Sequence, residues 1–388
     1  MMDAMPDEHR LLRQLVARFC REELLPLEPR VLARVAAGQG YGLLDDERQR
    51  LDALAKGLGL WGLDAPESLG GAALPVAAMV GVDEELGRTI VPYEFPPDSP
   101  NLRMLLACAD ERQRERYLAP YARGETASAI AITEPGAGSD PARMKTRARR
   151  DGDSWVLDGR KLWISRADRA DWTIVMAVTD PARGKRCGIS AFLVDRGTPG
   201  FLVERRIPMI GGTSTFELVL DACRIGTDQL LGREGEGFAP MQGRLARRRV
   251  QMAAWCIGRA QRALDMMVDY APQRHTFGAP LSERQAVQGW IADAATRLYA
   301  CRLMTHDIAA RLDRGEDARL QISIVKAYAT DMAWHVIDHA MQMFGAMGMS
   351  QEFPLQQMAN EARLMRIYEG PTEVHLGVVA RGVLGTVH

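Results

Sequence analysis

Residues 132–140 read Ile-Thr-Glu-Pro-Gly-Ala-Gly-Ser-Asp, and residues 161–165 read Lys-Leu-Trp-Ile-Ser. The two glycines leave backbone N–H groups open to an anion, and Thr133 and Ser139 add hydroxyl donors. Trp163 offers an aromatic face nearby. This mixture suits a flat cofactor that carries phosphate groups. A Gly-x-Gly turn alone is more often an ordinary surface turn, so the interpretation needs support from the rest of the chain.

The stretch lies where the sequence pattern changes from helices to strands. Between residues 8 and 123, apolar residues recur at spacings of three and four, as at Leu11, Leu15 and Phe19. Short runs rich in β-branched and aromatic residues follow at 155–157, 172–178, 187–194 and 214–220. The helical period returns after residue 237. We predict an α+β fold with an all-α domain at 1–126, an antiparallel β domain at 127–230 and a helical bundle at 231–388.

Composition narrows the class of protein. The 388 residues carry 49 basic and 50 acidic side chains, for a net charge of −1, so nothing global attracts nucleic acid or an anionic membrane. The six cysteines form no Cys-x-x-Cys pair, which favours a reducing compartment over a disulfide framework. Residues 1–10 are acidic where a signal peptide is basic, and no apolar run approaches the roughly 20 residues of a membrane span. We expect a soluble cytoplasmic protein without membrane insertion.

Two further features concern chemistry. In Arg366–Pro371, Gly and Pro break a helical pattern directly after Glu369, which places this carboxylate at a helix end or turn. Read alone, Glu369 fits a solvated turn. His335 and His339 stand four apart on a predicted helix, a spacing that metal ligands use, but no third ligand motif follows them. We expect no metal there.

Several motifs occur together and in order: residues 133–140, 161–165, 231–238, 274–278 with Gln285, 342–345, and the Glu369 turn. On these residues the chain resembles the acyl-CoA dehydrogenase family over essentially its whole length. Residues 345–351 and 369–375 are similar to the branch that includes eukaryotic members fused to a phosphotransferase-like domain. We expect a free-standing enzyme here.

The resemblance implies a reaction of fatty acid β-oxidation: FAD-dependent conversion of an acyl-CoA thioester to the trans-2-enoyl-CoA. Glu369 falls on the position of the base that removes the α-proton, while flavin N5 accepts the β-hydride; the base and the flavin must hold opposite sides of the substrate. Some relatives carry the base near the position of Arg248, but residues 244–251 contain no carboxylate. Arg249, Gly370 and Ser139 are implied to contact the substrate, and we expect Arg247 and Arg248 to lie on a solvated helix face.

The resemblance also implies the residues that bind FAD. The wall of the flavin site consists of Ile130, Ile132, Thr133, Gly138, Ser139, Trp163, Ile164 and Ser165. A second set reaches the cofactor bound mainly by a neighbouring subunit: Arg274, Thr276, Phe277, Gln285, Gln342, Gly345 and Ala346. We therefore expect a homodimer or homotetramer, with an electron-transferring flavoprotein as the electron acceptor. Ile130, where relatives often have an aromatic residue, and Ala346, in place of a second glycine, depart from the family pattern.

Alternatives remain at this stage. The same fold supports oxygen-reactive flavoenzymes such as acyl-CoA oxidases, nitroalkane oxidases and flavin monooxygenases, although a monooxygenase would not need Glu369. A flavin-free scaffold or heteromeric partner is the non-enzyme alternative, and the joint presence of Thr133, Trp163, Arg274 and Glu369 argues against it. The sequence does not fix the length or branching of the acyl chain.

Overall fold

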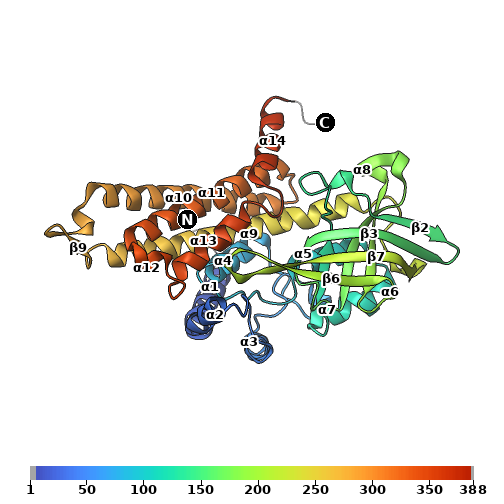
Figure 1. Cartoon of the computed structure of the whole chain (residues 1–388), viewed down its shortest axis with the longest axis horizontal. Coiled ribbons are helices and arrows are strands. Elements are labelled where there is room, and N and C mark those ends of the chain that lie inside the picture. Colours follow the sequence, from blue (N-terminus) through green and yellow to red (C-terminus); the bar gives the residue numbers. More distant parts are fainter. Residues whose placement is uncertain (1–5, 386–388) are drawn as a thin grey trace.

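The computed structural model describes residues 6–385, so the first five residues of the amino-terminal segment weighed above lie outside the described residues. Helices at the two ends of the sequence and a sheet from its middle form the α+β arrangement predicted (Figure 1). The sheet occupies one end of the molecule and a bundle of long helices the other. Among the described helices, none combines the length and apolar character needed to cross a membrane.

The amino-terminal helices form their own apolar core. They are α1 (Asp7–Phe19), α2 (Glu28–Ala36), α3 (Asp45–Gly57), α4 (Val76–Leu86), α5 (Ser99–Cys108), α6 (Glu111–Gln113) and α7 (Ala119–Arg123), with π-helical turns at Cys20–Leu24 and Arg114–Leu118. Val16, Phe19 and Leu51 are buried in this core, as the three-four spacing requires. Asp98 caps α5, because its side chain accepts a hydrogen bond from the backbone of Asn101.

The middle of the chain forms an eight-stranded sheet. Its strands are β1 (Ser128–Ala131), β2 (Arg147–Asp151), β3 (Ser154–Ile164), β4 (Trp172–Val178), β5 (Ile189–Asp195), β6 (Phe201–Pro208), β7 (Ser214–Gly226) and β8 (Leu230–Leu231). Their order is β6-β7-β3-β2-β4-β5-β8, with β1 beside β4. The prediction of a wholly antiparallel domain is wrong in one respect: β4 pairs in parallel with both β1 and β2. The charged strands β2 and β6 were not predicted, because their side chains are mostly exposed and form no apolar run.

Apolar side chains cover both faces of the sheet. On one face, Ile174 and Leu193 pack with Leu102 and Leu105 of α5. On the other, Trp155, Val175 and Phe192 form a separate core. Burial on both faces explains why residues 172–178 read as a nearly continuous apolar run.

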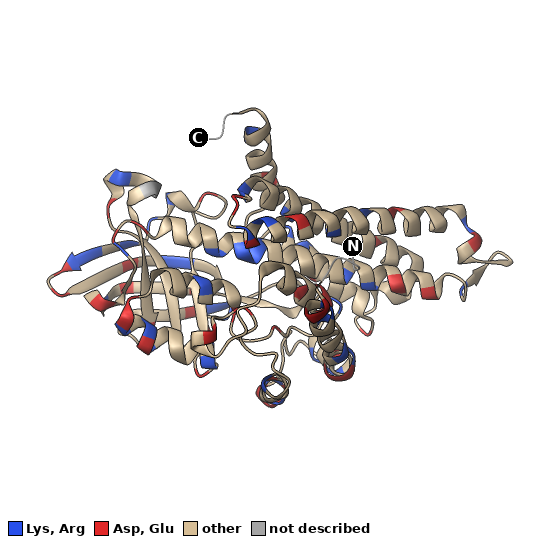
Figure 2. Cartoon of the chain, turned by 180° about the vertical axis from the view of Figure 1, so that it is seen from behind, with Lys and Arg blue, Asp and Glu red and all other residues tan. Residues whose placement is uncertain are grey.

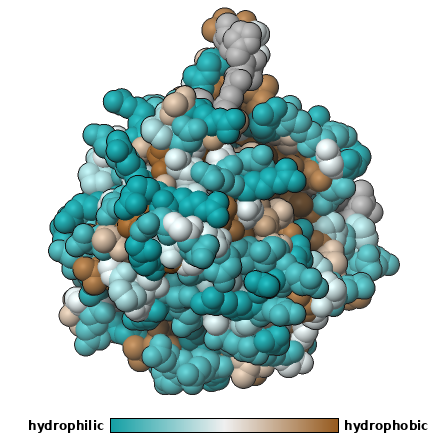
Figure 3. Space-filling view, turned by 90° about the vertical axis from the view of Figure 1, so that its right-hand side faces the viewer, coloured by the Kyte–Doolittle hydropathy of each residue, from teal (hydrophilic) through white to brown (hydrophobic). Residues whose placement is uncertain are grey.

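Long helices build the other end of the molecule. They are α9 (Phe238–Tyr270), α10 (Gln285–Asp313), α11 (Arg319–Phe344), α12 (Ala346–Met349), α13 (Pro354–Met365) and α14 (Thr372–Val383); α8 (Gly184–Cys187) is a short turn near the sheet. The 33 residues of α9 span about 50 Å and run from the sheet into the bundle (Figure 1). The helix α14 projects from the body, and Figure 3 shows hydrophobic residues near its base on an otherwise largely hydrophilic face.

Candidate active site

The loop at residues 132–140 is fixed by a buried ion pair. The Lys161 Nζ atom lies 2.9 Å from Glu134 Oε1, and the Lys161 side chain is fully buried. Glu134 also accepts the backbone N–H groups of Lys145 and Thr146, so both of its oxygens are occupied. The Leu162 N–H donates to the Thr133 carbonyl over 2.8 Å. The two motifs quoted first are thus joined into one rigid unit.

Trp163 stands at an irregular point of β3. The register with β7 shifts between Lys161 and Ile164, and Trp163 has a φ of +62°, a conformation rare for a bulky residue. Its side chain is 48% exposed, so a flat apolar surface faces outward. The Ile164 side chain, in contrast, is buried in the sheet core, which leaves only its main chain to face a ligand.

The other residues predicted for this wall lie near the same loop. Ile130 and Ile132 are half-buried and pack on the core between the sheet and α5, while Gly138, Ser139 and Ser165 are exposed. A Cβ atom on Gly138 would meet only the Thr133 methyl group, at 4.0 Å. The loop is therefore open on one side.

Glu369 lies in the tight turn between α13 and α14. Its φ is +57°, and Gly370 follows with a φ of +97°. A left-handed conformation costs a residue with a side chain energy, and such positions persist only where neighbours hold them. Here Arg249 Nε donates to the Glu369 carbonyl over 2.9 Å, and Lys326 Nζ donates to the Gly370 carbonyl over 2.5 Å. His375 Nε2 lies 3.2 Å from the Glu369 carbonyl.

Two of the side chains that hold this turn were missed by sequence reasoning, and both are buried. Lys326 is 0% and His375 1% exposed. Burial is the main cause that lowers the pKa of Lys326 to about 8. Burial, with Arg249 and Lys326 nearby, lowers the pKa of His375 to about 4. The sequence offered one sign that Lys326 is buried, because it stands in an apolar stripe with Ile322, Val325 and Ala329. The sequence around His375 gave no such sign of burial.

The carboxylate of Glu369 is only half satisfied. Arg244 Nη1 donates to Glu369 Oε1 over 2.8 Å, whereas Oε2 is buried and has no hydrogen-bond partner among the described residues. Arg244 Nε donates to Asn101, and Asn101 donates to the Ser128 hydroxyl at the start of β1. These contacts connect the Glu369 turn with the sheet end of the molecule. Arg244 was not among the predicted site residues.

The expectation that Arg247 and Arg248 lie on a solvated face is wrong. Both side chains are about nine-tenths buried: Arg247 Nη2 lies 3.4 Å from Asp64, and Arg248 bridges Glu94 and Asp98. The acids come from segments about 150 or more residues earlier in the chain, which fold against α9. Figure 2 shows basic residues gathered on α9 between the sheet and the bundle. Arg249 lies beside Glu369.

The second predicted set lies at the end of the molecule away from the sheet (Figure 1). A hairpin of β9 (His275–Thr276) and β10 (Ala279–Pro280) carries Arg274 and Phe277, and Phe277 is 99% exposed with a φ of +52°. Tyr270 stacks on Phe344 at 4.1 Å, which places the end of α11, with Gln342 and Gly345, beside this hairpin. The helix α9 separates Arg244 from Tyr270 by roughly 40 Å. Within one chain the two sets therefore do not meet (Figure 1).

Three of the predicted residues have a backbone conformation that is rare for residues with a side chain. Among the described residues, six non-glycine residues have positive φ, and Trp163, Phe277 and Glu369 are three of them. Strained positions of this kind cluster at functional sites, because the surrounding structure must hold them.

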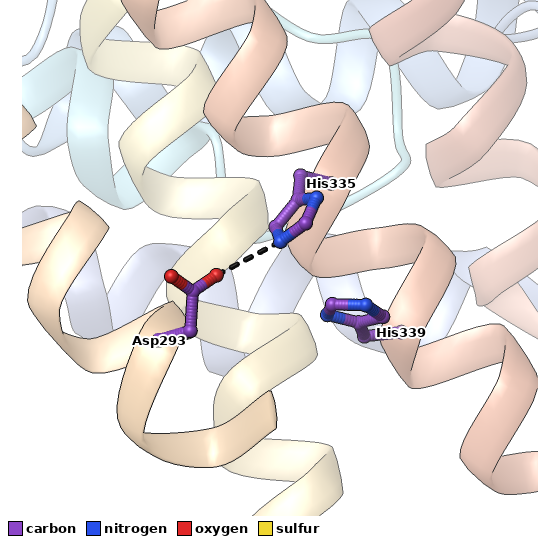
Figure 4. Close-up of side chains that lie close together, drawn as sticks. All are labelled: Asp293, His335 and His339. Carbon is purple, nitrogen blue, oxygen red and sulfur yellow. Dashed lines mark hydrogen bonds and ion pairs between the residues drawn. The ribbon is translucent and has the colours of Figure 1, made fainter. Parts of the chain in front are cut away.

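A further cluster joins α10 and α11. Asp293 supplies the third group beside His335 and His339 that the sequence did not reveal, and their ligand atoms all lie within 4.8 Å of one another (Figure 4). However, Asp293 Oδ2 already accepts both Arg297 Nε, at 2.7 Å, and His335 Nε2, at 2.8 Å. The His339 ring stacks on Trp290. The cluster is therefore a polar contact between α10 and α11. The positive charge of Arg297 beside Asp293 would repel a metal ion.

Comparison with known proteins agrees with this arrangement. Family models for the acyl-CoA dehydrogenase N-terminal, middle and C-terminal domains match residues 6–125, 129–223 and 235–384. The chain is 37% identical to (R)-benzylsuccinyl-CoA dehydrogenase of Thauera aromatica, over 98% of this chain and 96% of that protein. Butyryl-CoA dehydrogenase from Megasphaera elsdenii superposes with a TM-score of 0.87 at 29% identity, over 98% and 99% of the chains. PigA with FAD and proline gives a TM-score of 0.88 at 26% identity, over 98% of each chain.

Proposed function

The chain belongs to the acyl-CoA dehydrogenase family, and from this premise we propose that it oxidises an acyl-CoA thioester to the trans-2-enoyl-CoA with FAD, Glu369 being the base. The observation that carries the proposal is the Glu369 carboxylate: it sits on a strained turn, and its Oε2 is buried without a partner among the described residues. Buried carboxylate oxygens normally have a hydrogen-bond partner, so an oxygen without one calls for an explanation. A role in accepting a proton from a bound substrate would explain it.

The residues present fit FAD. Trp163 presents an exposed aromatic face beside a loop whose glycines leave room for backbone donors. Ile130, Ile132, Thr133, Gly138, Ser139, Ile164 and Ser165 would hold the cofactor at this wall. When bound, FAD supplies the acceptor for the hydride that leaves the β-carbon. The solved relative that contains FAD supports the same cofactor here.

The Glu369 turn would bind and activate the thioester. The backbone N–H of Glu369 donates no hydrogen bond within the described residues, so it is free for the thioester oxygen. A hydrogen bond to that oxygen stabilises the negative charge that develops as the α-proton leaves. Arg249 and Lys326 hold the two carbonyls of the turn and add positive charge behind it. Gly370 and Ser139 would complete the substrate contacts.

We further propose that two copies complete each cofactor site. Arg274, Thr276, Phe277, Gln285, Gln342, Gly345 and Ala346 would contact the FAD bound mainly by a second subunit, because they lie too far from Trp163 in their own chain. The guanidinium of Arg274 suits a pyrophosphate. Phe277, Val383 and Leu384 are 99%, 79% and 74% exposed, and such apolar surface favours a homodimer or homotetramer. An electron-transferring flavoprotein would accept the electrons, and the cytoplasm is the proposed location.

Anaerobic bleaching of the flavin by acyl-CoA tests the assignment of the base. Glu369→Gln should retain FAD and lose bleaching by roughly a thousandfold or more, because an amide does not accept the α-proton. Glu373→Gln, an exposed residue in the next helical turn, is the matched control and should bleach at the wild-type rate. Bleaching of Glu369→Gln at the wild-type rate would exclude Glu369 as the base. The relatives named above as acyl-CoA enzymes are dehydrogenases, so the oxygen-reactive alternative is not favoured.

A further inference from the structure

The basic side chains around Glu369 outnumber the carboxylates they contact. Arg244, Arg249 and Lys326 all hydrogen bond to residues 369 and 370, and among the described residues the Glu369 side chain is the only carboxylate in those contacts. Arg249 and Lys326 bind main-chain carbonyls there, which carry no net charge. The hydrogen bonds at this turn therefore join three basic side chains to one carboxylate before a substrate binds.

Arg244 is the member of this group that faces the reacting position. It is 7% exposed, and one of its nitrogens lies 2.8 Å from the oxygen of the base. Its Nε holds Asn101, while its Nη2 makes no hydrogen bond to a described residue. A guanidinium presents its nitrogens as a flat fork that matches a carboxylate with two parallel hydrogen bonds. Here only one branch of the fork is used on Glu369.

The ion pair also restrains the base. Its Oε1 atom accepts a hydrogen bond from Arg244, so the side chain cannot turn towards a substrate without losing that contact. A neutral acyl group has no carboxylate that could replace Glu369 as the partner of Arg244. An acyl group that carries a carboxylate provides such a partner, and Arg244 would then turn from Glu369 to the substrate.

We propose that Arg244 recognises a carboxylate carried by the acyl group, so that the substrate is the CoA thioester of a dicarboxylic acid. This inference rests on the proposed function. With the α-carbon against Glu369, a carboxylate a few bonds away lies within reach of Arg244. Binding exchanges one ion pair for another and leaves Glu369 free to take the α-proton.

The test compares each dicarboxylic substrate with its methyl ester, which has nearly the same shape and no charge. Glutaryl-CoA, adipyl-CoA and 2-methylsuccinyl-CoA place the carboxylate at different distances from the α-carbon. For at least one of them, the wild type should have a kcat/KM at least roughly tenfold higher for the acid than for the ester, measured by anaerobic flavin reduction. Arg244→Gln should abolish this preference, so that acid and ester reduce the flavin with equal kcat/KM whatever the absolute rate of the variant.

Binding provides a second measurement that does not depend on turnover. In Glu369→Gln, the dissociation constant should favour the acid over the ester, and the double variant with Arg244→Gln should not discriminate. Arg244→Lys keeps the charge and should keep a reduced preference if the glutamine variant fails to fold. Arg88→Gln, which breaks a half-exposed ion pair with Asp265 elsewhere on α9, is the control and should keep the full preference.

Three outcomes would overturn the proposal: a wild type that prefers all three esters, an Arg244→Gln variant that loses acid and ester activity by the same factor, or equal binding of acid and ester in Glu369→Gln. Each is distinct from failure of the proposed function, in which no CoA thioester, charged or neutral, would reduce the flavin.

Discussion

Glu134 and Glu369 are both largely buried beside a basic partner, and they differ in what remains unsatisfied. Glu134 pairs with Lys161 and also accepts two backbone N–H groups, so both of its oxygens are occupied. Glu369 pairs with Arg244 through one oxygen, and the other has no partner among the described residues. The first carboxylate is fully compensated and holds two segments together. The second is held in place by its backbone while its side chain remains available, which is what a base requires.

The largest effect on stability should come from breaking the first pair. Lys161→Ala leaves the Glu134 charge buried without its ion partner, and we expect the free energy of unfolding to fall by about 3–5 kcal/mol. Urea denaturation, with retention of FAD measured in parallel, checks this. Replacing both partners, Lys161→Met with Glu134→Gln, should recover part of the loss, since no charge is then left alone. A single variant as stable as the wild type would show that the pair does not hold the loop.

Acid should destabilise the turn around the second glutamate. Burial lowers the pKa of His375 to about 4 from an ordinary value of 6.5. The unfolded chain therefore binds the proton first, and stability is lost as pH falls from about 6.5 towards 4, by about 3 kcal/mol in total. His375→Gln should flatten the dependence of the melting temperature on pH over this range. The control His275→Gln changes an exposed histidine of the hairpin and leaves His375 intact, so the dependence should persist.

A smaller effect is expected from the backbone of the turn. Gly370 has a φ of +97°, and a Cβ atom there would lie 3.0 Å from His375 Nε2. Gly370→Ala should cost roughly 1–3 kcal/mol and displace Glu369, so flavin reduction should fall as well. A Cβ atom on Gly289 in α10 would meet nothing within 4 Å, and Gly289→Ala should be neutral or stabilising by up to about 1 kcal/mol. Equal effects of the two substitutions on urea denaturation would mean that the turn is not strained.

The smallest effect concerns the contact between α10 and α11. His335 and Asp293 are each more than a third exposed, and pairs of this kind contribute about 0–1 kcal/mol. His335→Ala should change stability within that range. Because Arg297 already binds the Asp293 carboxylate, zinc should not raise the melting temperature of the wild type above that of the variant. A saturable shift seen only with His335 present would identify a metal site after all.

Local pattern predicted the course of the chain well. The apolar run at 172–178 became β4, the helical period that returns after residue 237 became α9, and the break at Gly370 became the turn that carries Glu369. Motifs also named Trp163 and Arg249 as site residues, and their roles stay predictions. The predictions failed for charged residues. Arg247 and Arg248 were expected on a solvated face but are buried, and Arg244 and Lys326 were not predicted as site residues.

The sequence by itself determined the order of helices and strands and the family to which the chain belongs, because apolar periodicity and turn residues act over a few positions. Only the tertiary structure decided which charged groups are buried and what they contact. Burial of a charge depends on a partner, and here the partners are distant: Arg244 meets Glu369 across 125 residues, and Lys326 meets Gly370 across 44. The half-satisfied carboxylate of Glu369 is a product of that assembly, because no single segment of the chain contains both Glu369 and its partners.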